Sequence, residues 1–201
     1  VSKLKGYPGE IKAGYYVFGR AMNNRQIVNM LKSGAQTPVT LVIYNIRTKE
    51  EFAGLVGRTL EIDSNRLLAK LNDPDFCKQY GVDTNQILTR FIVDNYSFYW
   101  NTTIPKFMDK MTETYNDFWS TDRKNKADAI HLSPTDVTTL ASIVEKEVIR
   151  DKELPVVARV YLNRLKIGMP LQADPTLIFA LRDFEARRVN QRHKEYDSPY
   201  N

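Results

Sequence analysis

The 201-residue sequence has few of the residues on which several kinds of protein site depend. It contains one cysteine, Cys77, and two histidines, His131 and His193. A single cysteine cannot form an internal disulfide, and neither histidine lies in a metal-ligand spacing or beside an obvious nucleophile. We therefore expect neither a metal site nor a cofactor, and the redox compartment of the protein stays open.

Long apolar runs are also missing, and glycine and proline contribute only 9 residues each. A membrane-spanning helix requires roughly 18 consecutive apolar residues, and no run approaches that length. The composition is instead typical of a folded globular protein. The chain begins at Val1 without a methionine or a signal peptide, which indicates that it comes from a longer precursor.

The formal net charge is +5, from 29 Lys and Arg against 24 Asp and Glu. Such an excess favours an acidic partner, but the basic residues are scattered, with short clusters only at 123–126 and 187–194. This distribution is typical of a solvated surface. Because no nucleic-acid-binding motif accompanies the clusters, we expect no nucleic-acid partner.

Short strands and helices alternate in the first half of the sequence. Branched and aromatic residues predict strands at 13–18 and 39–46. Capping signals predict helices that begin after Asn24, Thr48 and Ser64 and end near residues 33, 60 and 71. After Pro105, apolar residues recur at spacings of three and four, which predicts a long helix with a core-facing stripe. Residues 121–128 are interpreted as a charged linker.

A well-marked helix begins near Ser133, with Pro134 at its first position and Asp136 completing the cap. Its predicted buried stripe, flanked by Glu145 and Glu147 on opposite sides, consists of Val137, Leu140, Ala141, Val144 and Val148. A carboxyl group at the border between core and cleft loses solvation of its charged form, so that it can act as a proton donor. The geometry alone does not choose between the two glutamates.

A second helix is predicted from Pro155 to about Ile167, where Gly168 ends it. Its expected buried stripe consists of Leu154, Val157, Ala158, Tyr161, Leu162 and Leu165. Residues 169–176 then form a predicted polar loop with prolines near both ends. Loops held by rigid helices are where binding residues concentrate.

Four blocks of the sequence, in this order, resemble the signature of the YceG-like endolytic murein transglycosylases. They are residues 141–147 (ASIVEKE), 163–165 (NRL), 169–176 (MPLQADPT) and 198–201 (SPYN). Residues 12–16 and 31–34 resemble the opening unit of the family more loosely. The resemblance thus covers nearly the whole chain and is strongest in its second half.

The resemblance implies an α+β fold in three parts. These are an N-terminal β-α unit at 1–37, a LysM-like subdomain at 38–95 and an α-rich catalytic domain at 96–201. LysM-like modules bind polymers of N-acetylglucosamine. In relatives the last block continues into a proline-rich loop that helps to wall the cleft, so the catalytic domain is expected to be truncated after Asn201.

The family's reaction cuts the β-1,4 bond between N-acetylmuramic acid (MurNAc) and N-acetylglucosamine (GlcNAc) in peptidoglycan strands. The C6 hydroxyl of the muramic acid attacks its own C1 and forms a 1,6-anhydro end, so one carboxyl group suffices. By family position this group is Glu145, with Glu147 as the fallback. The residues implied to line or brace the saccharide cleft are Asn163, Gln172, Asp174, Thr176, Ser198, Tyr200 and Asn201.

Two alternatives to a transglycosylase are open. One is a non-catalytic peptidoglycan-binding scaffold, and the other is a hydrolytic muramidase that uses Asp174 as a second carboxylate beside Glu145. The resemblance further implies peptidoglycan synthases as partners. It also implies a single N-terminal anchor in the inner membrane, outside this chain, with the present residues facing the periplasm.

Overall fold

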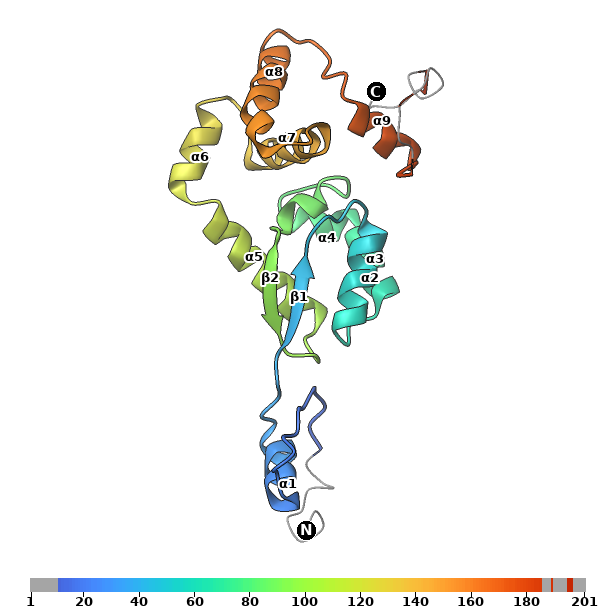
Figure 1. Cartoon of the computed structure of the whole chain (residues 1–201), viewed down its shortest axis with the longest axis vertical. Helices are drawn as coiled ribbons and strands as arrows, with labels where there is room; N and C mark the ends of the chain where they lie inside the picture. Colours follow the sequence, from blue (N-terminus) through green and yellow to red (C-terminus); the bar gives the residue numbers. More distant parts are fainter. Residues whose placement is uncertain (1–10, 186–188, 190–194, 197–201) are drawn as a thin grey trace. The chain divides into compact units, whose positions relative to one another are not determined.

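Two units, divided after Ser120, make up the chain in the computed structural model, which describes residues 11–185, 189 and 195–196 (Figure 1). Helices predominate in both units. The described part of the chain contains one sheet, formed by two antiparallel strands. This mixture agrees with the predicted α+β class.

Most helices of the first unit begin at a side chain that caps their free backbone N–H groups. At helix α2 the predicted capping box is present, because the Glu51 amide donates to the Thr48 hydroxyl at 3.1 Å. Helices α1 and α3 are capped by Asn23 and Asp63, one residue before the predicted caps. The helices are α1 (Asn24–Ser33), α2 (Lys49–Thr59), α3 (Ser64–Leu71), α4 (Pro74–Lys78), the 3₁₀ helix η3 (Ile87–Arg90) and α5 (Ile104–Phe118).

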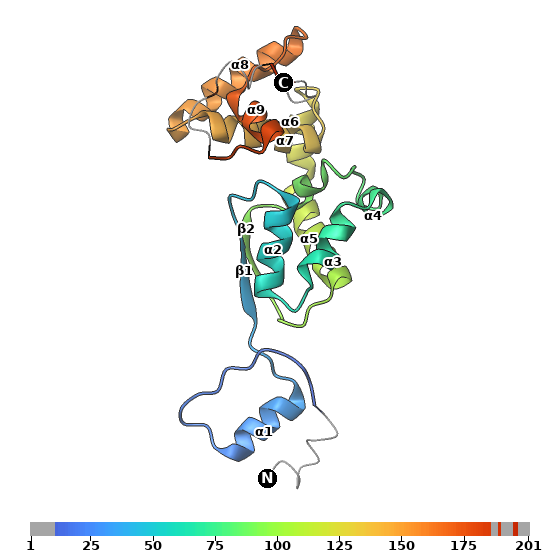
Figure 2. The ribbon, with the colours of Figure 1, turned by 90° about the vertical axis from the view of Figure 1, so that its right-hand side faces the viewer.

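The sheet buries one face and exposes the other. Strands β1 (Val39–Ile43) and β2 (Asp94–Phe98) pair with Leu41 opposite Tyr96. Alternation of side chains along each strand places Leu41, Ile43, Tyr96 and Phe98 in the core. Figure 2 shows α2 and α5 on the same side of the two strands. Strand β1 ends three residues before the predicted end at Ile46.

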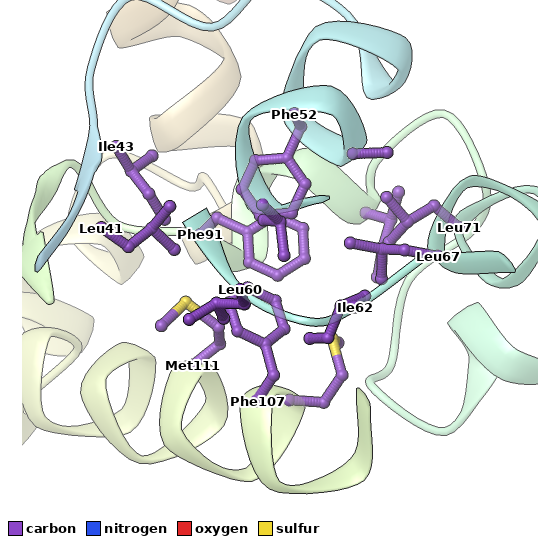
Figure 3. Packing of buried hydrophobic residues seen from close by; sticks show 14 of the residues in the cluster. Leu41, Ile43, Phe52, Leu60, Ile62, Leu67, Leu71, Phe91, Phe107 and Met111 are labelled. Carbon is purple, nitrogen blue, oxygen red and sulfur yellow. The ribbon is translucent and has the colours of Figure 1, made fainter. Parts of the chain in front are cut away.

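Three phenylalanines from separate segments meet in the core of the first unit (Figure 3). The rings of Phe52 and Phe91 stack with centroids 4.1 Å apart, and Phe107 lies 6.1 Å from Phe52. Phe107 and Met111 project from α5, so the stripe of this helix is core, as predicted. The expected boundary after residue 95 therefore does not coincide with the observed division after Ser120, because α5 packs with the sheet.

The strand predicted at 13–18 is wrong, because no strand forms there. The Thr37 amide donates to the Tyr15 carbonyl at 2.8 Å and the Val17 amide to the Thr37 hydroxyl at 3.3 Å. These two bonds tie the segments together without a ladder. Asn101 also donates from its side-chain amide to the Ala13 carbonyl at 3.0 Å, which joins this segment to the turn after β2.

The described part of the second unit is helical. Residues 121–128, interpreted from sequence as a linker, form helix α6 (Thr121–Asp128). An ion pair of 2.7 Å between Asp122 and Lys126, one turn apart, supports that helix. The unit continues with α7 (Pro134–Glu147), η4 (Asp151–Glu153), α8 (Leu154–Lys166) and α9 (Asp174–Leu181). None of the described helices is long and apolar enough to cross a membrane.

Candidate active site

Helix α7, which carries both candidate acids, starts at a complete capping box. The Asp136 amide donates to the Ser133 hydroxyl at 3.1 Å, and the Ser133 amide donates to the Asp136 carboxylate at 3.0 Å. Pro134 occupies the first helical position, where no N–H group is needed. The helix start predicted from sequence is confirmed.

The buried face of α7 is rotated from the predicted one. Val144 is buried, and Leu140 and Ile143 pack beside it, whereas Ala141 is exposed. On a helical wheel this face is centred away from Glu145, which lies on the opposite side and is exposed. The expected half-shielded position of Glu145 is therefore wrong in the described structure, because Ile143 rather than Ala141 faces the core.

Glu147 lies on the packed side of α7 and has a partner on α8. It forms a side-chain hydrogen bond with the hydroxyl of Tyr161, a residue only 4% exposed. Burial is the largest cause that raises the pKa of Tyr161 to about 12; the Glu147 charge and this hydrogen bond contribute to the same shift, while Arg164 opposes it. Below that pKa the phenol is a donor, so Glu147 serves as its acceptor and joins α7 to α8.

Helix α8 places the two polar residues of the Asn163-Arg164-Leu165 block on different sides. Asn163 is exposed, and the wheel places it opposite Tyr161, away from the interface with α7. Arg164 lies near that interface. Its guanidinium is 5.9 Å from the centre of the Tyr161 ring, and Nη1 donates to the Leu171 carbonyl. The structure thus brings Arg164, rather than Asn163, to the cluster around Tyr161.

The predicted buried stripe of α8 is correct except at Leu162, which lies outside the apolar cluster, and at Leu165. Leu154, Val157, Ala158 and Tyr161 pack against α7, but Leu165 is 44% exposed. The helix ends as predicted, with Gly168 in the left-handed conformation at φ 67°.

Residues 169–173 connect α8 to α9, and from Leu171 to Ala173 the side chains alternate between the apolar cluster and solvent. Ala173 is buried and Leu171 packs on the same cluster, whereas Gln172 is exposed. Gln172 also has a left-handed backbone, with φ 52°. Glutamine rarely adopts this conformation, and such residues often occur at functional sites. Sequence reasoning found Gln172 by family position but gave no sign of its backbone.

Asp174 and Thr176 are not loop residues, because both lie in the first turn of α9. The Thr176 hydroxyl donates to the Ala173 carbonyl at 2.7 Å. The cap position belongs to Ala173 and no side-chain cap bond is present, so Asp174 does not act as a capping residue. Asp174 is exposed, and its charge contributes to the raised pKa of Tyr161.

Three of the predicted cleft residues, Ser198, Tyr200 and Asn201, lie outside the described residues. In the described part of the second unit, Glu147, Arg164 and Asp174 lie close enough to the buried phenol of Tyr161 to shift its pKa. Glu145 lies apart from this cluster on the exposed side of α7, and no group of three or more His, Cys, Asp or Glu among the described residues could hold a metal ion.

A comparison of the sequence with protein-family models identifies one family over its whole length. The model of the YceG-like family matches residues 1–201. The chain belongs to the YceG-like family. The resemblance drawn from the four sequence blocks is therefore confirmed.

Curated proteins from two bacteria are similar to this chain. It is 29% identical over 224 residues to the endolytic murein transglycosylase of Bacillus subtilis (strain 168). The aligned region covers 99% of this chain and 59% of that relative. It is 27% identical to the protein of the same name from Streptococcus pneumoniae serotype 2, over 89% of this chain and 37% of that relative. The chain thus spans less than two thirds of these relatives.

A solved structure has the same fold. The crystal structure of a YceG-like protein from Listeria monocytogenes superposes with a TM-score of 0.71 at 26% identity. The match covers 99% of this chain and 71% of the other.

Proposed function

We propose that this YceG-like chain is the part of an endolytic murein transglycosylase that binds and cuts peptidoglycan strands. The observation that carries the proposal is the similarity to the Bacillus subtilis enzyme of that name over 99% of the chain. The position of the acid supports it, because Glu145 lies on a capped helix within the block at residues 141–147.

The two glutamates of α7 differ in their availability to a substrate. Both side chains are exposed, but within the described part of the chain the Glu145 carboxyl group has no hydrogen bond or ion pair. Glu147 is already the acceptor of the Tyr161 phenol. An acid must reach the glycosidic oxygen within hydrogen-bond distance, which favours a carboxyl group without a competing partner. We therefore assign the catalytic role to Glu145 and a structural role to Glu147.

In the proposed reaction, Glu145 protonates the oxygen of the MurNAc–GlcNAc β-1,4 bond as that bond breaks. The C6 hydroxyl of the same muramic acid forms the new bond to C1, and its proton passes to the Glu145 carboxylate. The acid is thereby regenerated, and no water is consumed. Because Glu145 is exposed, its carboxyl group is accessible to a glycan strand that binds from solvent.

The test compares Glu145→Gln with Glu147→Gln in the full-length protein. We expect Glu145→Gln to abolish the production of 1,6-anhydroMurNAc ends, measured by mass spectrometry of digested strands, without lowering the melting temperature. Glu147→Gln should keep the activity and lower the stability. Anhydro ends produced by Glu145→Gln would refute the assignment.

The same digest separates the alternatives. Strands that are bound but never shortened would identify a non-catalytic scaffold. Ends that carry a free reducing sugar would identify a hydrolytic muramidase, in which Asp174 would serve as the second carboxylate.

Three further features of the proposal concern the setting of the reaction. The segment from β1 to β2 would act as a LysM-like glycan-binding module. The full-length protein would be anchored in the inner membrane with these residues in the periplasm, and it would work beside peptidoglycan synthases to limit strand length. A reporter fused after Asn201, active only outside the cytoplasm, would test the orientation.

A further inference from the structure

The connection between α8 and α9 is held by one arginine. Arg164 donates from Nη1 to the Leu171 carbonyl, in the middle of residues 169–173. Its guanidinium also lies 5.9 Å from the centre of the Tyr161 ring, one turn earlier on α8. Tyr161 is buried and bonded to Glu147, so the arginine is braced against a fixed surface.

This connection has a demanding backbone. It leaves α8 through Gly168 in the left-handed conformation, and the Met169 amide donates to the Arg164 carbonyl at 2.8 Å. Gln172, four residues after Gly168, is also left-handed, a conformation that is unfavourable for a residue with a side chain. Such a conformation persists when the surrounding contacts determine it. The Arg164 bond to the carbonyl directly before Gln172 is such a contact.

We propose that Arg164 is a positioning residue, which holds residues 169–173 so that Gln172 and the first turn of α9 are presented to the glycan strand. The inference rests on the proposed function. It assigns the role of the Asn163-Arg164-Leu165 block to its arginine, whereas sequence reasoning selected Asn163. An arginine suits this task because its planar group can stack on an aromatic ring while its N–H groups donate.

The first measurement is the backbone order of residues 171–173 by ¹⁵N relaxation of the 201-residue chain. In the wild type we expect order parameters near the rigid value of about 0.85, and in Arg164→Met values below about 0.6. Arg159→Met is the matched control. It makes the same change on the same helix, at an exposed position outside the cluster, and should leave the order of the loop unchanged.

The second measurement is binding of purified glycan strands, made in the Glu145→Gln background so that strands are not cut. Loss of a charge-assisted hydrogen bond that fixes the loop should weaken binding by about tenfold or more in Arg164→Met. Arg164→Lys keeps the charge but not the planar group, so it should give intermediate order and affinity. If Arg164→Met does not fold, Arg164→Lys carries the test.

The outcomes separate this proposal from the proposed function. Unchanged order at 171–173, or lost order with unchanged affinity, would overturn the role of Arg164 while glycan binding by the parent protein stands. A parent protein that neither binds nor cuts strands would overturn the proposed function and this inference together. The role of Arg164 would be supported if Arg164→Met lost the order of residues 171–173 and bound strands more weakly, while Arg159→Met changed neither property.

Discussion

The hydrogen bond between Glu147 and Tyr161 makes a prediction that separates the two glutamates of α7 by stability. In Tyr161→Phe the ring remains in its buried site and only the hydroxyl is lost. A hydrogen bond to a charged group contributes about 1.5–3 kcal/mol. Glu147 is exposed, so water can solvate its carboxylate in the variant. We therefore expect a loss near the lower end of this range.

A double-mutant cycle isolates the bond from the other effects of each change. Tyr161→Phe combined with Glu147→Gln should be less destabilised than the sum of the two single variants, by about 1 kcal/mol. Glu145→Gln, one position on from Val144 but on the exposed side, should show no coupling to Tyr161→Phe. A coupling energy near zero for Glu147, or an equal one for Glu145, would refute this account of α7.

The assay must report on the second unit. Both tryptophans, Trp100 and Trp119, lie in the first unit, so their fluorescence follows the unfolding of that unit instead. Amide hydrogen exchange at α7 and α8 measures the opening free energy of the relevant helices directly.

The raised pKa of Tyr161 gives the same prediction a pH dependence. The folded-state pKa is about 12 against 10 for the free group, so the stabilising contribution is complete below pH 10. It is lost as the pH rises from 10 to 12, by about 1.4 kcal/mol per pH unit. Urea unfolding followed by circular dichroism should therefore show a smaller alkaline loss in Tyr161→Phe than in the wild type. An identical loss would contradict the cause assigned to the shift.

Two predictions concern the first unit. Phe52→Ala should cost about 3–5 kcal/mol of unfolding free energy, measured by urea titration with tryptophan fluorescence, because the Phe52 side chain is 1% exposed and stacks on Phe91; a cost below 1 kcal/mol would contradict this. Gly14→Ala should loosen the N-terminal segment and speed its proteolysis, because the new methyl group would lie 2.2 Å from Gln36, whereas Gly19→Ala meets no atom closer than 3.7 Å and should not.

The helix starts were the most predictable features of the fold, because their signals are local. The Thr48–Glu51 and Ser133–Asp136 boxes depend only on residues three apart. The shift by one residue at Asn23 arose because Asn23 and Asn24 can both cap a helix, and only Asn23 has a glutamine, Gln26, three residues later to complete a capping box.

Elements that depend on distant partners were predicted less well. Tyr15 and Val17 have side chains that favour strands. They are joined to Thr37 by one backbone and one side-chain hydrogen bond, and not by the repeated backbone hydrogen bonds of a sheet. Helix α6 has no apolar stripe, since Ala127 is its buried residue, and so it was interpreted as a linker. Helix α9 was missed because residues 177–181 are all apolar and show no helical period.

At the candidate site, sequence located the acid-bearing helix but not the orientation of its faces. The predicted stripe included Ala141, and the observed one includes Ile143, which rotates the packed face toward Glu147. Which face of α7 is buried depends on how α8 and α9 pack against it. A helical wheel drawn for one helix alone does not contain that information. The role of Arg164 and the backbone conformation of Gln172 depend on the same packing of helices.

The described core of the second unit is small, and its buried residues are Ala127, Val144, Tyr161, Ala173 and Leu177. A unit held by so few apolar contacts gains a large share of its stability from any ligand that binds only the folded form. At a hundredfold excess over the dissociation constant that gain is about 2.7 kcal/mol. If the ligand is a glycan strand, the amount of this unit that survives proteolysis would follow the supply of uncut strands. The amount of folded protein would then follow the amount of available substrate without a separate regulator.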